Sequence, residues 1–194
     1  MPVWGWILIG VLAAIAVVAV VAAVVAARAA RGRTRTEHLK ERFGPEYERT
    51  VGEVGEQRAA ENELAAREKK REALDIVSLS PEARDKYQES WRTVQTAFID
   101  DPSSAVGAAD RLVTDVMRQR GYPVDDFDRR AADISVDHPT VVDNYRAAHG
   151  VYLTQQNGTV RTEDQREAFV HYRTLFESLL ARENDQDNPK EARA

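Results

Sequence analysis

A continuous apolar run opens the chain and is the strongest pattern in the sequence. Between Val3 and Ala27 no side chain is charged or strongly polar, and 24 of the first 27 residues are hydrophobic. A helix of this length measures about 37 Å, whereas the hydrocarbon core of a bilayer is about 30 Å thick. The run therefore predicts a single transmembrane helix over residues 1–27.

The residues that flank this run predict its orientation. Trp4 and Trp6 lie at one end, where indole rings favour the membrane–water interface, and the other end carries a basic cluster of Arg28, Arg31, Arg33 and Arg35. Because basic residues stay on the cytoplasmic side, we expect a plasma-membrane protein with its N-terminus outside and its C-terminal domain in the cytoplasm. Secretion after cleavage near Ala27 is the alternative, opposed by the length of the run and by the lack of a preceding basic residue.

Charged helix-forming residues replace the apolar run over residues 28–73. Gly44-Pro45 is a helix breaker, so we expect a short helix before it and a longer one from Pro45 to Ala73. Tyr47, Val51 and Val54 start a heptad that the following residues do not continue. A helix that is polar on all faces is typical of a solvated spacer, which is the prediction for this connector, with a self-associating coiled coil as the alternative.

Amphipathic periodicity becomes regular over residues 74–182. A stripe at spacings of 4, 3 and 4 follows the helix start Ser80-Pro81 and consists of Tyr87, Trp91, Val94 and Phe98. Further breaks fall at Asp101-Pro102, Gly121, Asp137-His138-Pro139 and Asn157-Gly158, and Thr162 opens a capping box. The pattern predicts an all-α chain whose C-terminal part is a four- to five-helix bundle with Trp91 buried, followed by a disordered polar tail over residues 183–194.

Three stretches within residues 80–180 are distinctive: YQESWRTVQTAFIDDPSSAVGAADRLVTDVMRQRGYPVDDF, RRAADISVDHPTVVDNYRAAHG and TEDQREAFVHYRTLFESLL. They resemble a family of uncharacterised bacterial proteins described as membrane or secreted proteins. This resemblance implies no activity and no catalytic residues, so it adds nothing to the expected chemistry.

Charge is distributed unevenly along the chain. The 194 residues include no cysteine and carry a net charge of −5, which divides into +2 over residues 28–73 (12 basic, 10 acidic) and −7 over residues 74–194 (15 basic, 22 acidic). Nucleic-acid binding needs a net basic footprint, so we expect no nucleic-acid partner. The basic cluster after the apolar run is better explained by contacts with the headgroups of the lipid bilayer.

Candidate chemistry is sparse. The histidines form no HExxH or i,i+4 metal pair, and His138 and His149 lie eleven residues apart on one expected helix, which is too far for a shared metal. The aspartates are best explained as helix caps, and no nucleophile elbow, Walker loop or GxGxxG is present, so we expect no metal, no cofactor and no catalytic residue. The most unusual surface feature is a candidate anion or partner site around Arg118, Arg120, Tyr122, Arg129 and Arg130.

These patterns favour a membrane-tethered, non-enzymatic interaction or scaffold module that binds an unknown protein partner. A small-ligand or signal-sensing bundle with a pocket near Arg118 and Tyr122 is the alternative, and an enzyme with an unrecognised site is the third hypothesis. A weak homodimer through the connector, or through the small residues Ala19, Ala23 and Ala27, is compatible with each of them.

Overall fold

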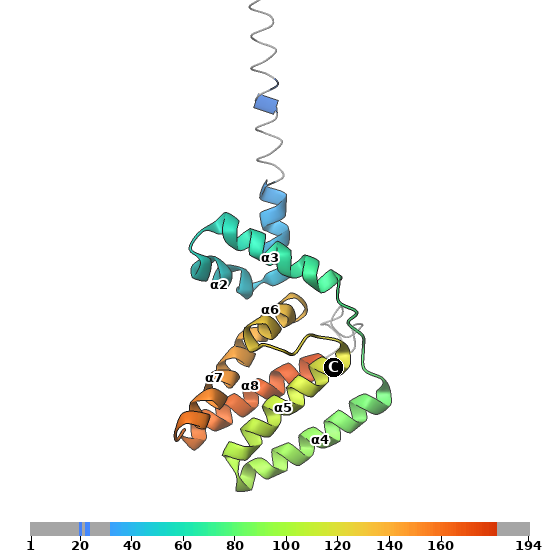
Figure 1. The fold of residues 1–194 in the computed structure, drawn as a ribbon, viewed down its shortest axis with the longest axis vertical. Helices are drawn as coiled ribbons and strands as arrows, with labels where there is room; N and C mark the ends of the chain where they lie inside the picture. Colours follow the sequence, from blue (N-terminus) through green and yellow to red (C-terminus); the bar gives the residue numbers. More distant parts are fainter. Residues whose placement is uncertain (1–19, 21, 24–31, 182–194) are drawn as a thin grey trace, which may run out of the picture. The chain divides into compact units, whose positions relative to one another are not determined.

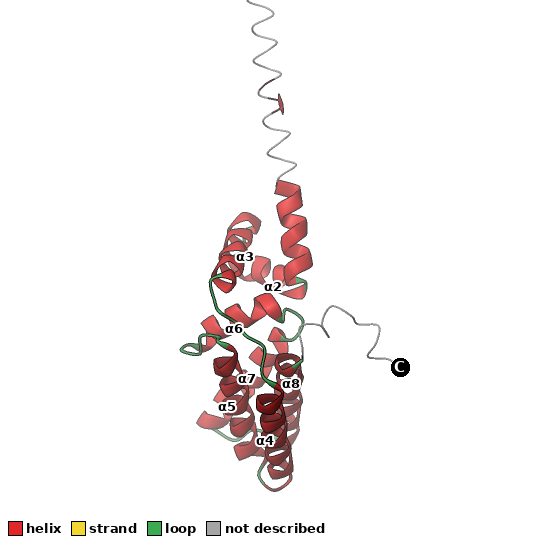
Figure 2. Ribbon diagram, turned by 90° about the vertical axis from the view of Figure 1, so that its right-hand side faces the viewer, coloured by secondary structure: helices red, strands yellow, loops and turns green. Residues whose placement is uncertain are grey.

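A computed structural model describes residues 20, 22–23 and 32–181, and within these residues every regular element is a helix (Figure 2). The all-α prediction is therefore confirmed for the described part. Most of the expected span over residues 1–27 lies outside it, as do Trp4, Trp6, Arg28, Arg31 and the tail over 183–194. A search of the described residues finds no helix with the length and hydrophobicity needed to cross a membrane.

The chain divides into two compact units, residues 1–41 and residues 42–194. In the first unit, residues 32–41 are helical, and Arg33 and Arg35 are exposed there. The second unit contains all the labelled helices of Figure 1.

A helical hairpin starts the second unit. It consists of α2 (Pro45–Val54) and α3 (Gln57–Glu72), separated by Gly55 in the left-handed conformation at φ 78°. Glu56 caps α3 by accepting hydrogen bonds from the backbone N–H groups of Arg58 and Ala59. The expectation of one helix from Pro45 to Ala73 was wrong, because a glycine in this conformation ends a helix and the next residue starts another.

The prediction of a solvated connector over residues 28–73 is wrong for residues 42–73, which belong to the same compact unit as the bundle. Tyr47, Ala60 and Leu64 are buried, and α3 packs on α6. Hydrogen bonds also join α2 to α3 within the hairpin. The Tyr47 hydroxyl donates to Glu61 at 2.9 Å, and the Gln57 amide donates to the same carboxylate at 2.8 Å. A few buried apolar residues and many ion pairs thus replace the continuous stripe that marks an ordinary packed helix.

Five helices form the bundle, as predicted, four long and one short. Local capping places their starts: Ser80 accepts from the N–H of Ala83, Asp101 from that of Ser104, and Asp126 from that of Arg129. The helices are α4 (Pro81–Asp100), α5 (Pro102–Arg120), α6 (Phe127–Asp137), α7 (Val142–Asn157) and α8 (Thr162–Leu180).

Two expected helix starts differ from the structure. Val141, rather than a residue of Asp137-His138-Pro139, is the N-cap of α7, because Asp137 ends α6 and His138 is its C-cap. Thr162 is the first residue of α8 rather than its cap, and no side-chain cap bond forms at Arg161. The capping-box prediction at Thr162 was therefore wrong.

The long helices lie side by side in the order α4, α5, α8, α7, as Figure 1 shows. Helix α8 packs on both α5 and α7, and it contributes Phe169, Tyr172 and Leu175 to the core. Helix α4 lies at the edge against α5, and Trp91 is its single buried residue. Trp91 is stacked on Phe169 and Phe176 at centroid distances of 5.0 and 4.7 Å, so its predicted burial is confirmed.

The segment between α3 and α4 is fastened to the C-terminal end of α5. Val77 donates its N–H to the carbonyl of Arg120 at 2.9 Å, and the Arg120 side chain donates to the carbonyls of Val77 and Leu179 at 3.2 and 3.1 Å. Gly121 follows with φ 95°, and a Cβ at this position would lie 2.4 Å from the carbonyl oxygen of Asp75. Both the backbone conformation and the space therefore require glycine here.

We predict that Gly121→Ala lowers the free energy of unfolding by at least about 2 kcal/mol, through left-handed strain and the clash with Asp75. Gly150→Ala is the matched control, because Gly150 lies inside α7 with open space around it. Alanine should stabilise that position by up to about 1 kcal/mol. Urea unfolding of the detergent-solubilised full chain measures both changes, and similar values for the two variants would contradict the assignment.

Candidate functional site

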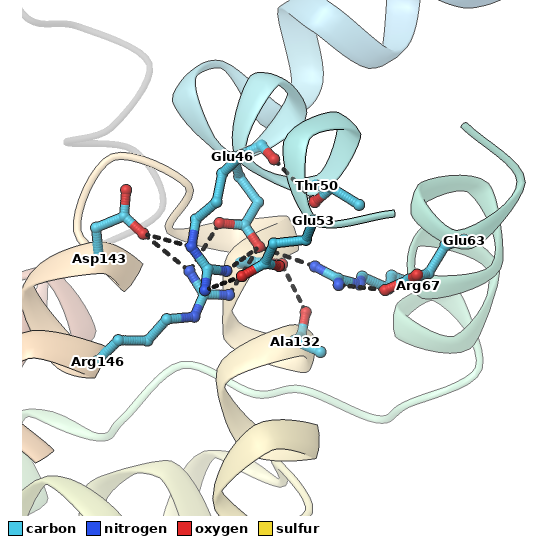
Figure 3. A network of polar contacts seen from close by, with 10 residues as sticks. Glu46, Thr50, Glu53, Glu63, Arg67, Ala132, Asp143 and Arg146 are labelled. Carbon is cyan, nitrogen blue, oxygen red and sulfur yellow. Dashed lines mark hydrogen bonds and ion pairs between the residues drawn. The ribbon is translucent and has the colours of Figure 1, made fainter. Parts of the chain in front are cut away.

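A buried carboxylate joins the helical hairpin to the bundle. Glu46 on α2 is 0% exposed, and Arg146 on α7 forms a two-pronged ion pair with it, each N–O distance being 2.7 Å (Figure 3). Arg67 on α3 donates to the same carboxylate at 2.9 Å. Three helices thus meet at one charge, and paired guanidinium donors make the contact directional.

Surrounding groups complete this polar network. Arg67 also pairs with Glu63, and Arg146 with Asp143 (Figure 3). Burial alone raises the pKa of Glu46, but the hydrogen bonds and charges of Arg146 and Arg67 outweigh it, so the pKa of this carboxyl lies below its ordinary value. Glu46 therefore remains ionised in the folded protein.

Two further charge contacts tie α3 to α6 and its end. Lys70 donates to both carboxylate oxygens of Asp133 at 2.6 Å, although the Asp133 side chain is only 2% exposed. Arg71 pairs with Asp137, which also accepts a hydrogen bond from the Tyr122 hydroxyl. Ion pairs from both α2 and α3 therefore connect the hairpin to the bundle.

The charged groups of this network pair with one another and connect the hairpin to the bundle. Within the described residues no group of three or more His, Cys, Asp or Glu side chains could hold a metal ion. The carboxylates of Glu46, Asp133 and Asp137 each have cationic partners within the protein. The charges of the network are consequently paired within the protein, and the network positions the hairpin.

A separate groove lies between the edge helix α4 and α8. It encloses about 510 Å³, and Trp91, Phe176 and Leu180 contribute apolar surface to it. Its other lining residues are Arg84, Gln88, Arg92, Gln95, Arg173, Glu177 and Ala181. Its volume falls within the range of sites that hold small ligands or anchoring side chains.

Two donors at this groove have no hydrogen-bond acceptor within the described part of the chain. These are Nε1 of Trp91, a residue that is 6% exposed, and Nε of Arg84. Buried polar groups in folded proteins are usually hydrogen-bonded, so these two nitrogens set the side chains that line the groove apart from the satisfied network around Glu46. The groove is therefore the best candidate binding site in the described structure.

The candidate anion site predicted from the sequence does not assemble as one surface. Arg120, Tyr122 and Arg130 are buried, while Arg118 and Arg129 are exposed. The Arg130 guanidinium lies 5.7 Å from the Phe127 ring centroid and donates to Thr114. Arg120 and Tyr122 are similarly committed, to backbone carbonyls and to Asp137. The buried members of the group therefore have structural roles.

A second groove between α4 and α5 contains one of these residues. Arg118 lines it together with Tyr87, Leu112 and Asp115, and Arg118 pairs with Asp115. Tyr122 lines neither of the two grooves. Of these two grooves, only the one between α4 and α5 includes a residue of the predicted pocket, Arg118.

The histidines also differ from expectation, since His138 and His149 do not share a helix. His138 is the buried C-cap of α6, and its Nδ1 lies 2.6 Å from the Ser178 hydroxyl. His149 lies on α7, stacked on Phe127 at 3.7 Å, and contacts Asp110 at 3.3 Å. Burial, with the charges of nearby arginines, lowers the pKa of His138 to about 4, so this imidazole is neutral in the folded protein.

Searches for related proteins return nothing: no protein-family profile, curated protein or solved structure matches this chain. The resemblance of residues 80–180 to uncharacterised bacterial proteins stays a prediction.

Sequence reasoning missed the residues of both sites for different reasons. The Glu46–Arg146 contact joins residues 100 positions apart, and no local spacing signals such a pair. The groove lies beside the stripe that predicted α4, and its arginines read as an ordinary solvated face. The one available signal was Trp91, a large aromatic on a helix with few other buried residues.

We predict that Glu46→Gln lowers the free energy of unfolding by about 3 kcal/mol, because it removes the buried carboxylate that Arg146 and Arg67 share, while the remaining partners, Asp143 and Glu63, are half-exposed. Glu53→Gln is the control, since the Glu53 side chain is 52% exposed and its pair with Arg49 is a surface ion pair. That change should cost less than about 1 kcal/mol. Urea unfolding at neutral pH tests both, and a loss below 1 kcal/mol for Glu46→Gln would refute the role of the buried carboxylate.

We also predict that His138 makes the free energy of unfolding depend on pH. Between its unfolded pKa of about 6.5 and its folded pKa of about 4, only the unfolded chain binds a proton there, so stability falls as the pH falls. Going from pH 7 to pH 5 should remove about 2 kcal/mol of unfolding free energy through this residue. His138→Asn keeps a hydrogen-bonding group near Ser178 but does not titrate, and should lose that much less than the wild type. Equal pH dependence in the two proteins would exclude His138 as the cause.

Proposed function

We propose that this chain is a membrane-tethered, non-enzymatic interaction module whose binding surface is the groove between α4 and α8. The observation that supports it is the combination, at one concave surface, of apolar side chains with buried donors that lack acceptors. The polar network around Glu46 is already satisfied and serves to position the hairpin. The groove between α4 and α8 presents apolar and basic side chains that this network does not use.

The tether is a proposal from sequence. Residues 1–27 have the composition of a single membrane span. Trp4 and Trp6 lie near its start and the basic cluster follows its end, which favours a cytoplasmic C-terminal side. An interaction module at a membrane surface gains local concentration of its partners, which is a reason to anchor a small helical domain.

A small-ligand sensor is the second candidate, and the groove volume of about 510 Å³ favours it. The two hypotheses differ in what occupies the groove. A protein partner covers the rim of α4 and α8 as well as the floor, whereas a small ligand contacts the floor alone.

Photocrosslinking in membranes tests the proposed function. The full chain carries benzoylphenylalanine at Gln88, a groove residue, or at Ala147, an exposed position on α7, and is expressed in a bacterial host. We expect a discrete protein adduct from Gln88 but not from Ala147, retained in the membrane pellet after alkaline carbonate extraction. Identical adduct patterns at the two positions, or adducts in the soluble fraction only, would overturn the proposal.

A further inference from the structure

The groove between α4 and α8 has a basic rim on an acidic protein. Three arginines line it, Arg84, Arg92 and Arg173, against one carboxylate, Glu177, so the lining residues carry +2 in a chain whose net charge is −5. Arg173 donates Nε to Glu177 at 2.7 Å, and Arg92 pairs with Glu89 at 3.0 Å. Each guanidinium has five N–H donors, so most of these donors remain available for a ligand.

Aromatic and aliphatic side chains of α4 and α8 form an apolar surface in the groove. Phe176 and Leu180 are buried core residues of α8 that also line the groove, and Trp91 is stacked on Phe176. Arg84, Arg92 and Arg173 place guanidinium groups beside this apolar surface, and a carboxylate is the group that pairs best with a guanidinium. The ligand must therefore combine an apolar side chain with acidic groups.

The length of the groove indicates a peptide rather than a compact metabolite. Its lining residues extend from Arg84 to Gln95 along α4, about 16 Å of helix, and from Arg173 to Ala181 along α8, about 12 Å. A helical or extended peptide segment fits such a groove, with anchors spaced along one face.

We propose that the groove binds an acidic peptide segment of a partner protein, one that presents a large apolar side chain flanked by carboxylates. This inference rests on the proposed function, because it names the chemical class of partner for the same groove. The chain's own residues 183–188 are a competing occupant, since they carry three carboxylates and begin two residues after Ala181. They contain no apolar side chain to cover Phe176 and Leu180, so the partner segment is the better match.

Peptide selection on the full chain tests this proposal. A phage-displayed library of random twelve-residue peptides is selected on the protein in phosphatidylcholine nanodiscs, and the most enriched peptide is labelled with fluorescein for anisotropy titration. We expect it to contain at least two Asp or Glu residues and one Leu, Ile or Phe. Its amide version, with Asn and Gln in place of the acids, should bind at least about tenfold more weakly, as should the original peptide at high salt.

Two matched triple variants locate the binding. Arg84→Gln, Arg92→Gln and Arg173→Gln together remove the basic rim, whereas Arg118→Gln, Arg129→Gln and Arg166→Gln remove the same charge from exposed positions outside the groove. We expect about a tenfold loss of affinity in the first variant and less than a twofold change in the second. Thermal unfolding followed by circular dichroism verifies that both variants fold.

Three outcomes would overturn the proposal. These are enrichment of neutral or basic peptides, equal weakening by the two triple variants, and a tenfold gain in affinity when residues 182–194 are removed, which would assign the groove to the chain's own segment. Crosslinking from Gln88 separates this failure from that of the proposed function. A protein adduct without acidic-peptide binding refutes only the partner chemistry, whereas the absence of any adduct refutes the groove as an interaction surface.

Discussion

The contact of one carboxylate with two guanidinium groups determines where the helical hairpin lies. Glu46 is fully buried, and removing a charge from water is costly unless its partners repay the cost with good geometry. Arg146 and Arg67 do so from α7 and α3, and the pair with Arg146 ties the hairpin to the bundle. A hydrophobic interface tolerates small shifts, whereas a paired buried charge penalises them.

The groove follows from the unequal packing of the bundle. Helix α8 packs between α5 and α7, while α4 lies at the edge against α5 and has Trp91 as its single buried residue. The apolar stripe of α4 is therefore partly uncovered, and the space between α4 and α8 is bordered by side chains that serve the core on one side and face the groove on the other. The same feature that makes α4 the least buried helix creates the candidate binding surface.

Local chemistry in the sequence was enough to predict the bundle but not the way in which its parts are fastened. Ser80, Asp101 and Asp126 mark helix starts through short-range caps, and Trp91 marks the core through its size. The hairpin and the groove depend on contacts between distant segments. Buried arginines such as Arg120 also look like solvated ones in a sequence, because their acceptors are backbone carbonyls that every residue has.

Arg120 has one more consequence for the bundle. Its guanidinium holds the carbonyl of Val77, where the chain enters the bundle, and that of Leu179, where the chain leaves it. The last turn of α8 therefore has little freedom to fray without also releasing the segment that precedes α4. One side chain thus couples the two ends of the bundle, and local opening at either end becomes part of a single cooperative event.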